Sequence, residues 1–154
     1  MYAVSATREV NPPGIVPVVT AEQVWRGLVM KAENAVPFVT AMEQCRVLER
    51  YHDGFLREIV LRGVRMTERI TFTPPVEVYF ERIEAQGYDG WITNLLSESD
   101  RGLMLTFTFA VGFPGVEPNS AEEKRRGDEV KASYLSAVDT TLVAVRQLVQ
   151  GSRL

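Results

Sequence analysis

The sequence predicts a single α+β domain in which a curved antiparallel sheet of seven strands wraps around a long C-terminal helix. Three observations lead to this prediction. Residues 43–113 alternate apolar and polar side chains between strong turn signals, and residues 120–150 repeat apolar side chains every three or four positions. A length of 154 residues without internal repeat or linker suits one domain, which we expect over residues 1–154.

The first predicted elements are a strand and a helix. Residues 2–10 alternate as a strand does and end at a turn rich in proline and glycine. Thr20 and Gln23 then match a capping box, in which the hydroxyl and the amide side chain each accept a backbone N–H, so a helix of about three to four turns begins there. Pro37 breaks this pattern, and residues 38–42 predict a second short helix.

Six strands are predicted in the middle of the chain, because five turn signals divide it. The turns are Asp53-Gly54, Arg62-Gly63, Thr73-Pro74-Pro75, Gly87-Tyr88-Asp89-Gly90 and Asp100-Arg101-Gly102. The strands are predicted at residues 43–52, 55–62, 64–73, 76–84, 91–98 and 103–113. Connections this short join antiparallel neighbours, so we expect a meander.

The longest helical pattern begins at a second capping box, formed by Ser120 and Glu123. Its apolar face is made of Val130, Tyr134, Val138, Leu142, Val145 and Leu148. About thirty residues span roughly 45 Å at helical rise, which is enough to cross the sheet. A sheet that curls around such a helix leaves space at its open end, and apolar clefts of this kind are common ligand sites.

Composition argues against several classes of function. The formal net charge is −3 and basic residues alternate with acidic ones, so we expect no nucleic-acid partner. No stretch approaches the roughly eighteen apolar residues of a membrane-spanning helix. The single cysteine, Cys45, suits a reducing compartment, and we expect a cytoplasmic protein. We expect neither a metal nor a cofactor, because one histidine alone does not build a metal site.

Three segments carry a resemblance to a known family. They are residues 22–35 (EQVWRGLVMKAENA), residues 57–63 (REIVLRG) and residues 105–109 (LTFTF). With the order of elements, they resemble the helix-grip architecture of the START-like and pollen-allergen superfamily, often called SRPBCC, and within it the uncharacterised AtaL-like family. The resemblance spans nearly the whole chain. It implies a hydrophobic cavity and a role near small-molecule metabolism. The glycine-rich loop of the plant allergens is absent, so their ligands do not transfer to this chain.

The predicted hairpin register places charged groups on an otherwise apolar face. If residues 62–63 form a two-residue turn, Arg57 lies opposite Glu68, with apolar pairs on either side. If residues 52–54 form a three-residue loop, Glu49 also lies opposite Arg57. Three strands would then contribute to one polar patch, and these residues are the candidate catalytic groups.

Three roles are open for this patch. A structural ion pair at a pocket rim is favoured, because buried charges must be paired. Orientation of a ligand by the donors of Arg57 and acid–base catalysis are the alternatives. A register shift of one residue would turn all three charges toward solvent. His52 is expected to be a solvated turn residue and not a general base.

Aromatic side chains are the main candidates to line the pocket, although aromatic residues more often serve as plain core packing. The candidate ligand-binding residues are Trp25, Phe38, Arg57, Glu68, Phe80, Trp91, Phe107, Phe109, Tyr134 and Val138. We expect a binding protein for a small hydrophobic or aromatic molecule, because no catalytic motif is present. A cyclase or dehydratase acting on a polyketide-like or aromatic metabolite is the alternative, and a protein interaction module is the third.

Overall fold

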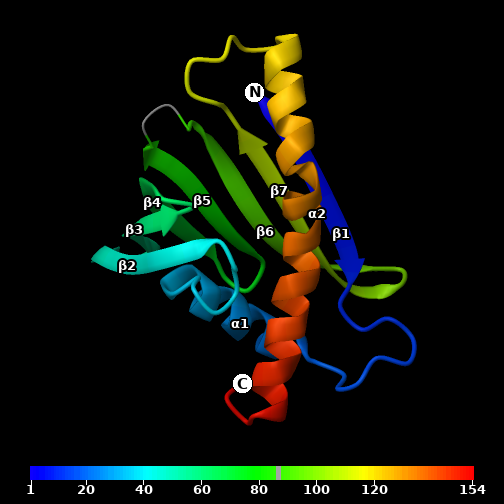
Figure 1. Cartoon of the computed structure of the whole chain (residues 1–154). Coiled ribbons are helices and arrows are strands. Elements are labelled where there is room, and N and C mark those ends of the chain that lie inside the picture. The colour runs from blue at the N-terminus through cyan, green and yellow to red at the C-terminus, as the bar shows by residue number, and fades with distance from the viewer. Residues whose placement is uncertain (86–87) are drawn as a thin grey trace.

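The computed structural model describes residues 1–85 and 88–154, and its elements follow the predicted order (Figure 1). The helices are α1 (Ala21–Glu33) and α2 (Ala121–Gln150). The strands are β1 (Tyr2–Glu9), β2 (Met42–Tyr51), β3 (Gly54–Leu61), β4 (Val64–Thr73), β5 (Glu77–Glu84), β6 (Gly90–Ser99) and β7 (Gly102–Val111). The α+β class is confirmed, and each predicted strand lies within about two residues of an observed one.

The strands form one antiparallel sheet in the order β1-β7-β6-β5-β4-β3-β2. Strands β2 to β7 are a meander, and β1 pairs with β7 at the far edge. Helix α2 runs the length of the molecule and packs on β1 and β7, whereas α1 packs on α2 and near β2, β5 and β6 (Figure 1). The inner face of the middle strands is therefore covered by α1 at one end of the sheet.

The second short helix predicted after β1 is wrong. Residues 36–38 form a turn, in which the amides of Phe38 and Val39 both donate to the carbonyl oxygen of Ala35. Pro37 has no amide hydrogen, and the short connection must reverse direction before β2, so a turn replaces the helix. The predicted turn at residues 87–90 includes Gly87, which lies outside the described residues.

The two predicted capping boxes differ in the structure. At α1 the Thr20 hydroxyl accepts from the Gln23 amide, and the Gln23 side chain accepts from the Thr20 amide, as predicted. At α2 the Ser120 hydroxyl accepts from the Glu123 amide. The Glu123 carboxylate instead accepts from the Asn119 amide and pairs with the amino group of Met1. The N-terminal strand is thereby tied to the start of α2.

The predicted β3–β4 register is confirmed. Arg62 and Gly63 have φ angles of 49° and 77°, as a tight hairpin turn with two left-handed residues requires. Arg57 therefore lies opposite Glu68, and the apolar pairs on either side are those predicted. The charged pair faces the interior, because both residues are buried.

The predicted place of Glu49 opposite Arg57 is wrong. Tyr51 pairs with Gly54, so the β2–β3 loop has two residues and not three. An irregularity between Val47 and Glu49 then shifts the register, and Val47 lies opposite Arg57. Glu49 is exposed and accepts a hydrogen bond from the Tyr51 hydroxyl at 3.0 Å. It is not part of the interior patch.

The core fills the space between the inner face of the sheet and the two helices. Its largest fully buried apolar side chains are Phe55, Phe107, Leu28, Ile59, Ile70 and Leu105. The helices cross closely at Gly27, where an added methyl group would lie 2.6 Å from Cγ2 of Val145. Among the described residues, neither helix is long and apolar enough to span a membrane.

Candidate functional site

Charged side chains form a row across the inner face of three neighbouring strands. Arg57 of β3 lies opposite Glu68 of β4, and Glu68 lies opposite Arg82 of β5. An irregularity in β5 next to Arg82 accompanies this pairing. The three side chains are at most 5% exposed, so the charges lie in the protein interior.

Arg57 is fully engaged by protein groups. Its Nε and Nη2 donate to Oε2 of Glu68 at 2.8 and 2.7 Å, and its Nη1 donates to the carbonyl oxygen of Ala32 at 2.8 Å. Nη1 also lies 3.7 Å from Sγ of Cys45. These contacts fasten β3 to β4 and to the end of α1, so Arg57 has a structural role whatever else the site does.

Lys31 of α1 extends this group of charges toward β6. Its side chain is buried, and Nζ donates to Oδ1 of Asn94 at 2.9 Å. The ammonium lies over two aromatic rings, at 4.7 Å from the centroid of Phe107 and 5.2 Å from that of Phe80. The guanidinium of Arg57 lies 5.0 Å from the Phe80 centroid. We name Lys31, Arg57, Glu68, Arg82 and Asn94 the buried polar cluster.

The cluster holds more positive than negative charge. Three of its members are basic, and its one carboxylate, Glu68, is shared by Arg57 and by Arg82, whose Nε lies 4.0 Å from Oε1. Burial, followed by repulsion from Arg57, lowers the pKa of Lys31 to about 7. The attraction of Glu68 opposes this shift but does not cancel it.

Two hydrogen-bond donors of the cluster have no acceptor among the described residues. They are Nε of Arg82 and Nδ2 of Asn94, and both atoms are buried. A buried donor without an acceptor costs about 1 to 3 kcal/mol. Such atoms at the same site as a lysine of lowered pKa are typical of a functional site more than of a packed core.

The family is shown by comparison with known proteins. A family model described as acetylaranotin biosynthesis cluster protein L, AtaL, matches residues 4–152. The chain belongs to the AtaL family. The predicted resemblance is thereby confirmed, whereas comparison with curated proteins gives no match.

Solved structures that are similar to this AtaL-family chain share its fold at low identity. A protein of Thermus thermophilus has a TM-score of 0.70 and 18% identity, with 99% of this chain and 100% of that one covered. The ZhuI aromatase/cyclase from a Streptomyces species gives 0.68 and 18%, covering 98% and 97%. Ara h 8.0201 gives 0.61 and 11%, covering 97% and 98%. These structures confirm the START-like, pollen-allergen fold of this AtaL-family chain.

The predicted pocket residues fall into separate groups in this AtaL-family protein. Those that lie on the inner sheet face or against it are Arg57, Glu68, Phe80, Phe107, Phe109, Tyr134 and Val138. Tyr134 of α2 stacks on Phe109 at a centroid distance of 4.5 Å. Trp25 of α1 contacts Phe72 edge to face at 6.1 Å. Phe38 is buried in the connection between α1 and β2.

Trp91 was expected in the pocket, and this is wrong. Ile92, Asn94 and Leu96 take the inward positions of β6, so the alternation of the strand places Trp91 on the outer face. There its ring stacks with Tyr79 at 6.4 Å. His52 lies in the two-residue loop between β2 and β3 and is exposed, as predicted.

Lys31 and Arg82 were not among the predicted site residues. Side chains alternate between the two faces of a strand, so the inward Val78 and Phe80 of β5 predict that Arg82 also points inward. The same alternation in β6 predicts an inward Asn94. Lys31 follows Leu28 by three residues on the buried face of α1, which was a usable signal. A lone charge on an apolar stripe is easily taken for a side chain that reaches to solvent.

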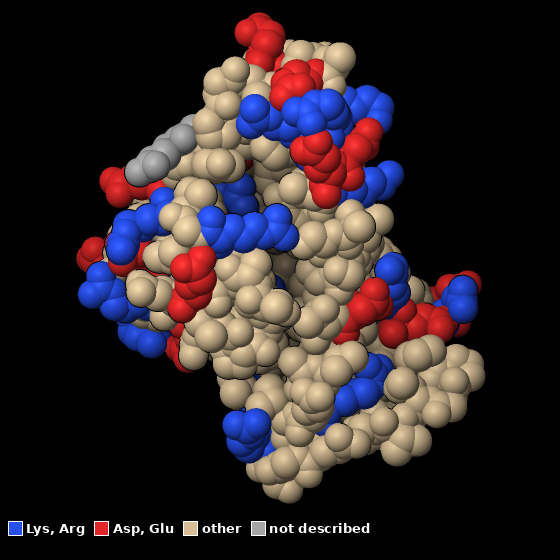
Figure 2. Space-filling model, viewed as in Figure 1, with Lys and Arg blue, Asp and Glu red and all other residues tan. Residues whose placement is uncertain are grey.

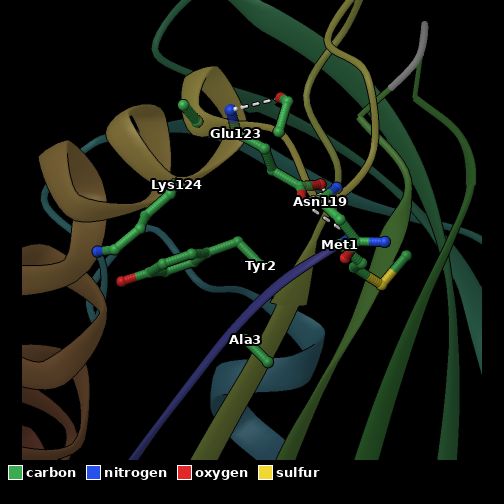
Figure 3. Close-up of a pocket in the computed structure, with 8 residues that line it drawn as sticks. Met1, Tyr2, Ala3, Asn119, Glu123 and Lys124 are labelled. Carbon is green, nitrogen blue, oxygen red and sulfur yellow. Dashed lines mark hydrogen bonds and ion pairs between the residues drawn. The ribbon is translucent and has the colours of Figure 1, made fainter.

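Two surface hollows differ from the predicted pocket, because none of the predicted aromatic residues lines them. One, of about 370 Å³, lies where β1 meets the start of α2; Figure 3 shows the Glu123 carboxylate there beside Met1 and Asn119, with the Tyr2 hydroxyl pointing toward Lys124. The other, of about 640 Å³, follows the β2 edge and reaches Cys45, which contacts Arg57. Figure 2 also shows a narrow hollow between α2 and the β2 side, with basic atoms visible inside it.

Proposed function

We propose that this AtaL-family protein binds a small molecule with an apolar or aromatic body, and that the buried polar cluster orients the polar end of that molecule. The observation that carries the proposal is the pair of buried donors, on Arg82 and Asn94, for which no group of residues 1–85 and 88–154 is an acceptor. A structural ion pair needs only Arg57 and Glu68. Lys31, Arg82 and Asn94 add desolvation costs that folding alone does not explain.

The surroundings of the cluster support an aromatic ligand. Phe80 and Phe107 lie beside the basic groups, and Phe109 and Tyr134 continue the aromatic surface toward α2. Such a site combines apolar walls with a few fixed polar groups, which is the usual composition of a small-molecule site. The ZhuI protein, whose fold is the same, is an aromatase/cyclase.

The proposal is tested by displacement of Nile red, a neutral apolar dye, by a panel of naphthalene and anthracene derivatives that carry hydroxyl, carbonyl or carboxyl groups. We expect polar-substituted members to displace the dye and to raise the melting temperature. Asn94→Leu should weaken their binding, whereas Trp91→Leu, on the outer face, should leave it unchanged. Indifference of the wild-type protein to the whole panel would contradict the proposal.

An enzyme of the cyclase or dehydratase kind is the second candidate, and the pKa of Lys31 favours it. A group whose pKa lies near 7 can both donate and accept a proton at neutral pH. Lys31 replaces Glu49 as the candidate acid–base group, because Glu49 lies at the surface. If catalysis occurs, turnover of a polyketide-like β-diketone should be lost in Lys31→Met and retained in Glu49→Gln; unchanged turnover in Lys31→Met excludes this mechanism.

A further inference from the structure

The charge balance of the buried polar cluster indicates which polar group it accepts. Glu68 neutralises Arg57 through two hydrogen bonds, so the charge of Arg82 and that of protonated Lys31 have no full counter-charge inside the cluster. Glu68 is the only carboxylate among the five cluster residues, so no second acidic side chain of the cluster offsets these charges. Buried positive charge is stable when a negative group lies beside it.

Two free donors lie close together at Lys31 and Asn94. The Lys31 ammonium uses one contact on Oδ1 of Asn94, and Nδ2 of the same amide has no acceptor among the described residues. Nδ2 and Oδ1 belong to one planar amide group, so an oxygen placed next to the ammonium can also accept from Nδ2. Asn94 is 1% exposed, which makes hydrogen bonding to bulk water an unsatisfactory alternative.

The rings beside this donor pair define the rest of the ligand. Asn94 lies opposite Phe107 in the β6–β7 register, and the rings of Phe107 and Phe80 lie under the ammonium. A ligand whose oxygen contacts Lys31 would therefore place the rest of its body beside these aromatic rings. An aromatic acid, or the enolate of an aromatic or polyketide-like ketone, has both the oxygen for the donor pair and the apolar body for the rings.

We infer that the Lys31–Asn94 donor pair is an anion site, which takes a carboxylate or enolate oxygen of an aromatic ligand and gains a proton on Lys31 when the ligand binds. This inference rests on the proposed binding function and adds the charge of the ligand to it. The carboxylate and the enolate have the same chemistry, a delocalised anionic oxygen next to an apolar ring.

Proton uptake follows from the groups that surround Lys31. Burial between α1 and the sheet, followed by repulsion from Arg57 of β3, lowers the pKa of Lys31 to about 7, whereas Glu68 of β4 and Cys45 of β2 favour its ammonium form. Arg82 of β5 adds positive charge behind Glu68. An incoming anion favours the protonated amine, so binding above pH 7 draws a proton from solution.

The experiment uses 2-naphthoic acid and its uncharged counterpart, 2-naphthamide, in isothermal titration calorimetry with the full chain. At pH 6.5 we expect the acid to bind at least about tenfold more tightly than the amide. At pH 8 the acid should bind with net proton uptake, which is measured from the difference in heat between phosphate and Tris buffers. Its affinity should fall by up to about tenfold per pH unit above the pKa of free Lys31.

Variants assign the effect to the donor pair. Lys31→Met should abolish proton uptake and the preference for the acid, and Asn94→Leu should reduce the preference while uptake remains. Arg26→Met, on an exposed part of the same helix, is the matched control and should behave as wild type. Circular dichroism establishes that each variant is folded. If Lys31→Met does not fold, Lys31→Gln takes its place in the same titrations.

The outcomes separate this inference from the proposed function. Equal affinity for the acid and the amide, or proton uptake that persists in Lys31→Met, would overturn the anion site while leaving the proposed binding function intact. Failure of both compounds to bind, with no dye displacement by the wider panel, would overturn both.

Discussion

Arg57 places two nitrogen atoms, Nε at 2.8 Å and Nη2 at 2.7 Å, on a single carboxylate oxygen of Glu68. The second oxygen of Glu68 is left facing Arg82, at 4.0 Å from its Nε. One carboxylate therefore serves two buried arginines. The ion pair of Arg57 with Glu68 therefore has a structural role, whereas Arg82 and Lys31 lack a full negative counter-charge within the cluster.

Glu68→Gln should lower the free energy of unfolding by about 3 to 5 kcal/mol, because it leaves Arg57 and Arg82 without a counter-charge in the interior. Urea denaturation at pH 7 measures this loss. Glu58→Gln is the matched control: Glu58 also pairs with two arginines, Arg46 and Arg65, but on the exposed side of the sheet, so a much smaller change is expected. Equal losses of unfolding free energy in the two variants would show that the stabilising effect of Glu68 does not depend on its burial.

The stability of the wild-type protein should rise as the pH increases from 7 toward 9.5. The pKa of Lys31 is about 7 in the folded protein and near 10.5 in the unfolded chain, so the unfolded state binds more protons across this window. One pKa unit corresponds to about 1.4 kcal/mol, which makes the slope measurable by urea denaturation at several pH values. The slope should be much smaller in Lys31→Met, and identical slopes in the two proteins would contradict the lowered pKa.

Gly27→Ala should destabilise the protein by about 1 to 3 kcal/mol, although alanine favours helices, because the new methyl group meets Val145 at 2.6 Å. Thermal and urea denaturation measure the change. Combining it with Val145→Ala tests the cause, since the double variant should lose less than the sum of the two single variants. Strict additivity would mean that the contact between α1 and α2 at this point is not tight.

Phe80→Leu should weaken the binding of 2-naphthoic acid several-fold, because the Phe80 ring lies beside both Lys31 and Arg57. Trp91→Leu removes a larger ring from the neighbouring strand, but on the outer face of the sheet, and should have no effect on binding. Calorimetric titration compares the two variants. A greater loss in Trp91→Leu would place the ligand on the opposite face from the cluster.

Local patterns predicted most of the fold and part of the cluster. The Arg62-Gly63 turn set the register that pairs Arg57 with Glu68, and alternation along the strands set their burial. The irregularity between Val47 and Glu49 was not predictable, because an extra residue in an edge strand leaves no mark in the alternating pattern. Glu49 was wrongly placed in the cluster for a different reason: the β2–β3 loop has two residues and not three, so Glu49 lies opposite Leu56.

The contribution of α1 to the site was harder to predict. Lys31 meets Asn94, sixty-three residues further along the chain, only because α1 packs under the end of the sheet. Periodicity shows which face of a helix is buried, but not which strand that face meets. The wrong short helix after Pro37 had another cause, because a few apolar residues at helical spacing do not distinguish a short helix from a turn.

The most direct test of the central claim is the titration of Lys31 itself, followed by NMR of the side-chain ¹³Cε with Lys31→Met used to assign the signal. We predict a pKa near 7 in the free protein and a clear increase when 2-naphthoic acid is bound, with no such increase for 2-naphthamide. A Lys31 resonance that titrates at the ordinary lysine pKa, and that neither compound changes, would contradict the claim that the buried polar cluster is a ligand site.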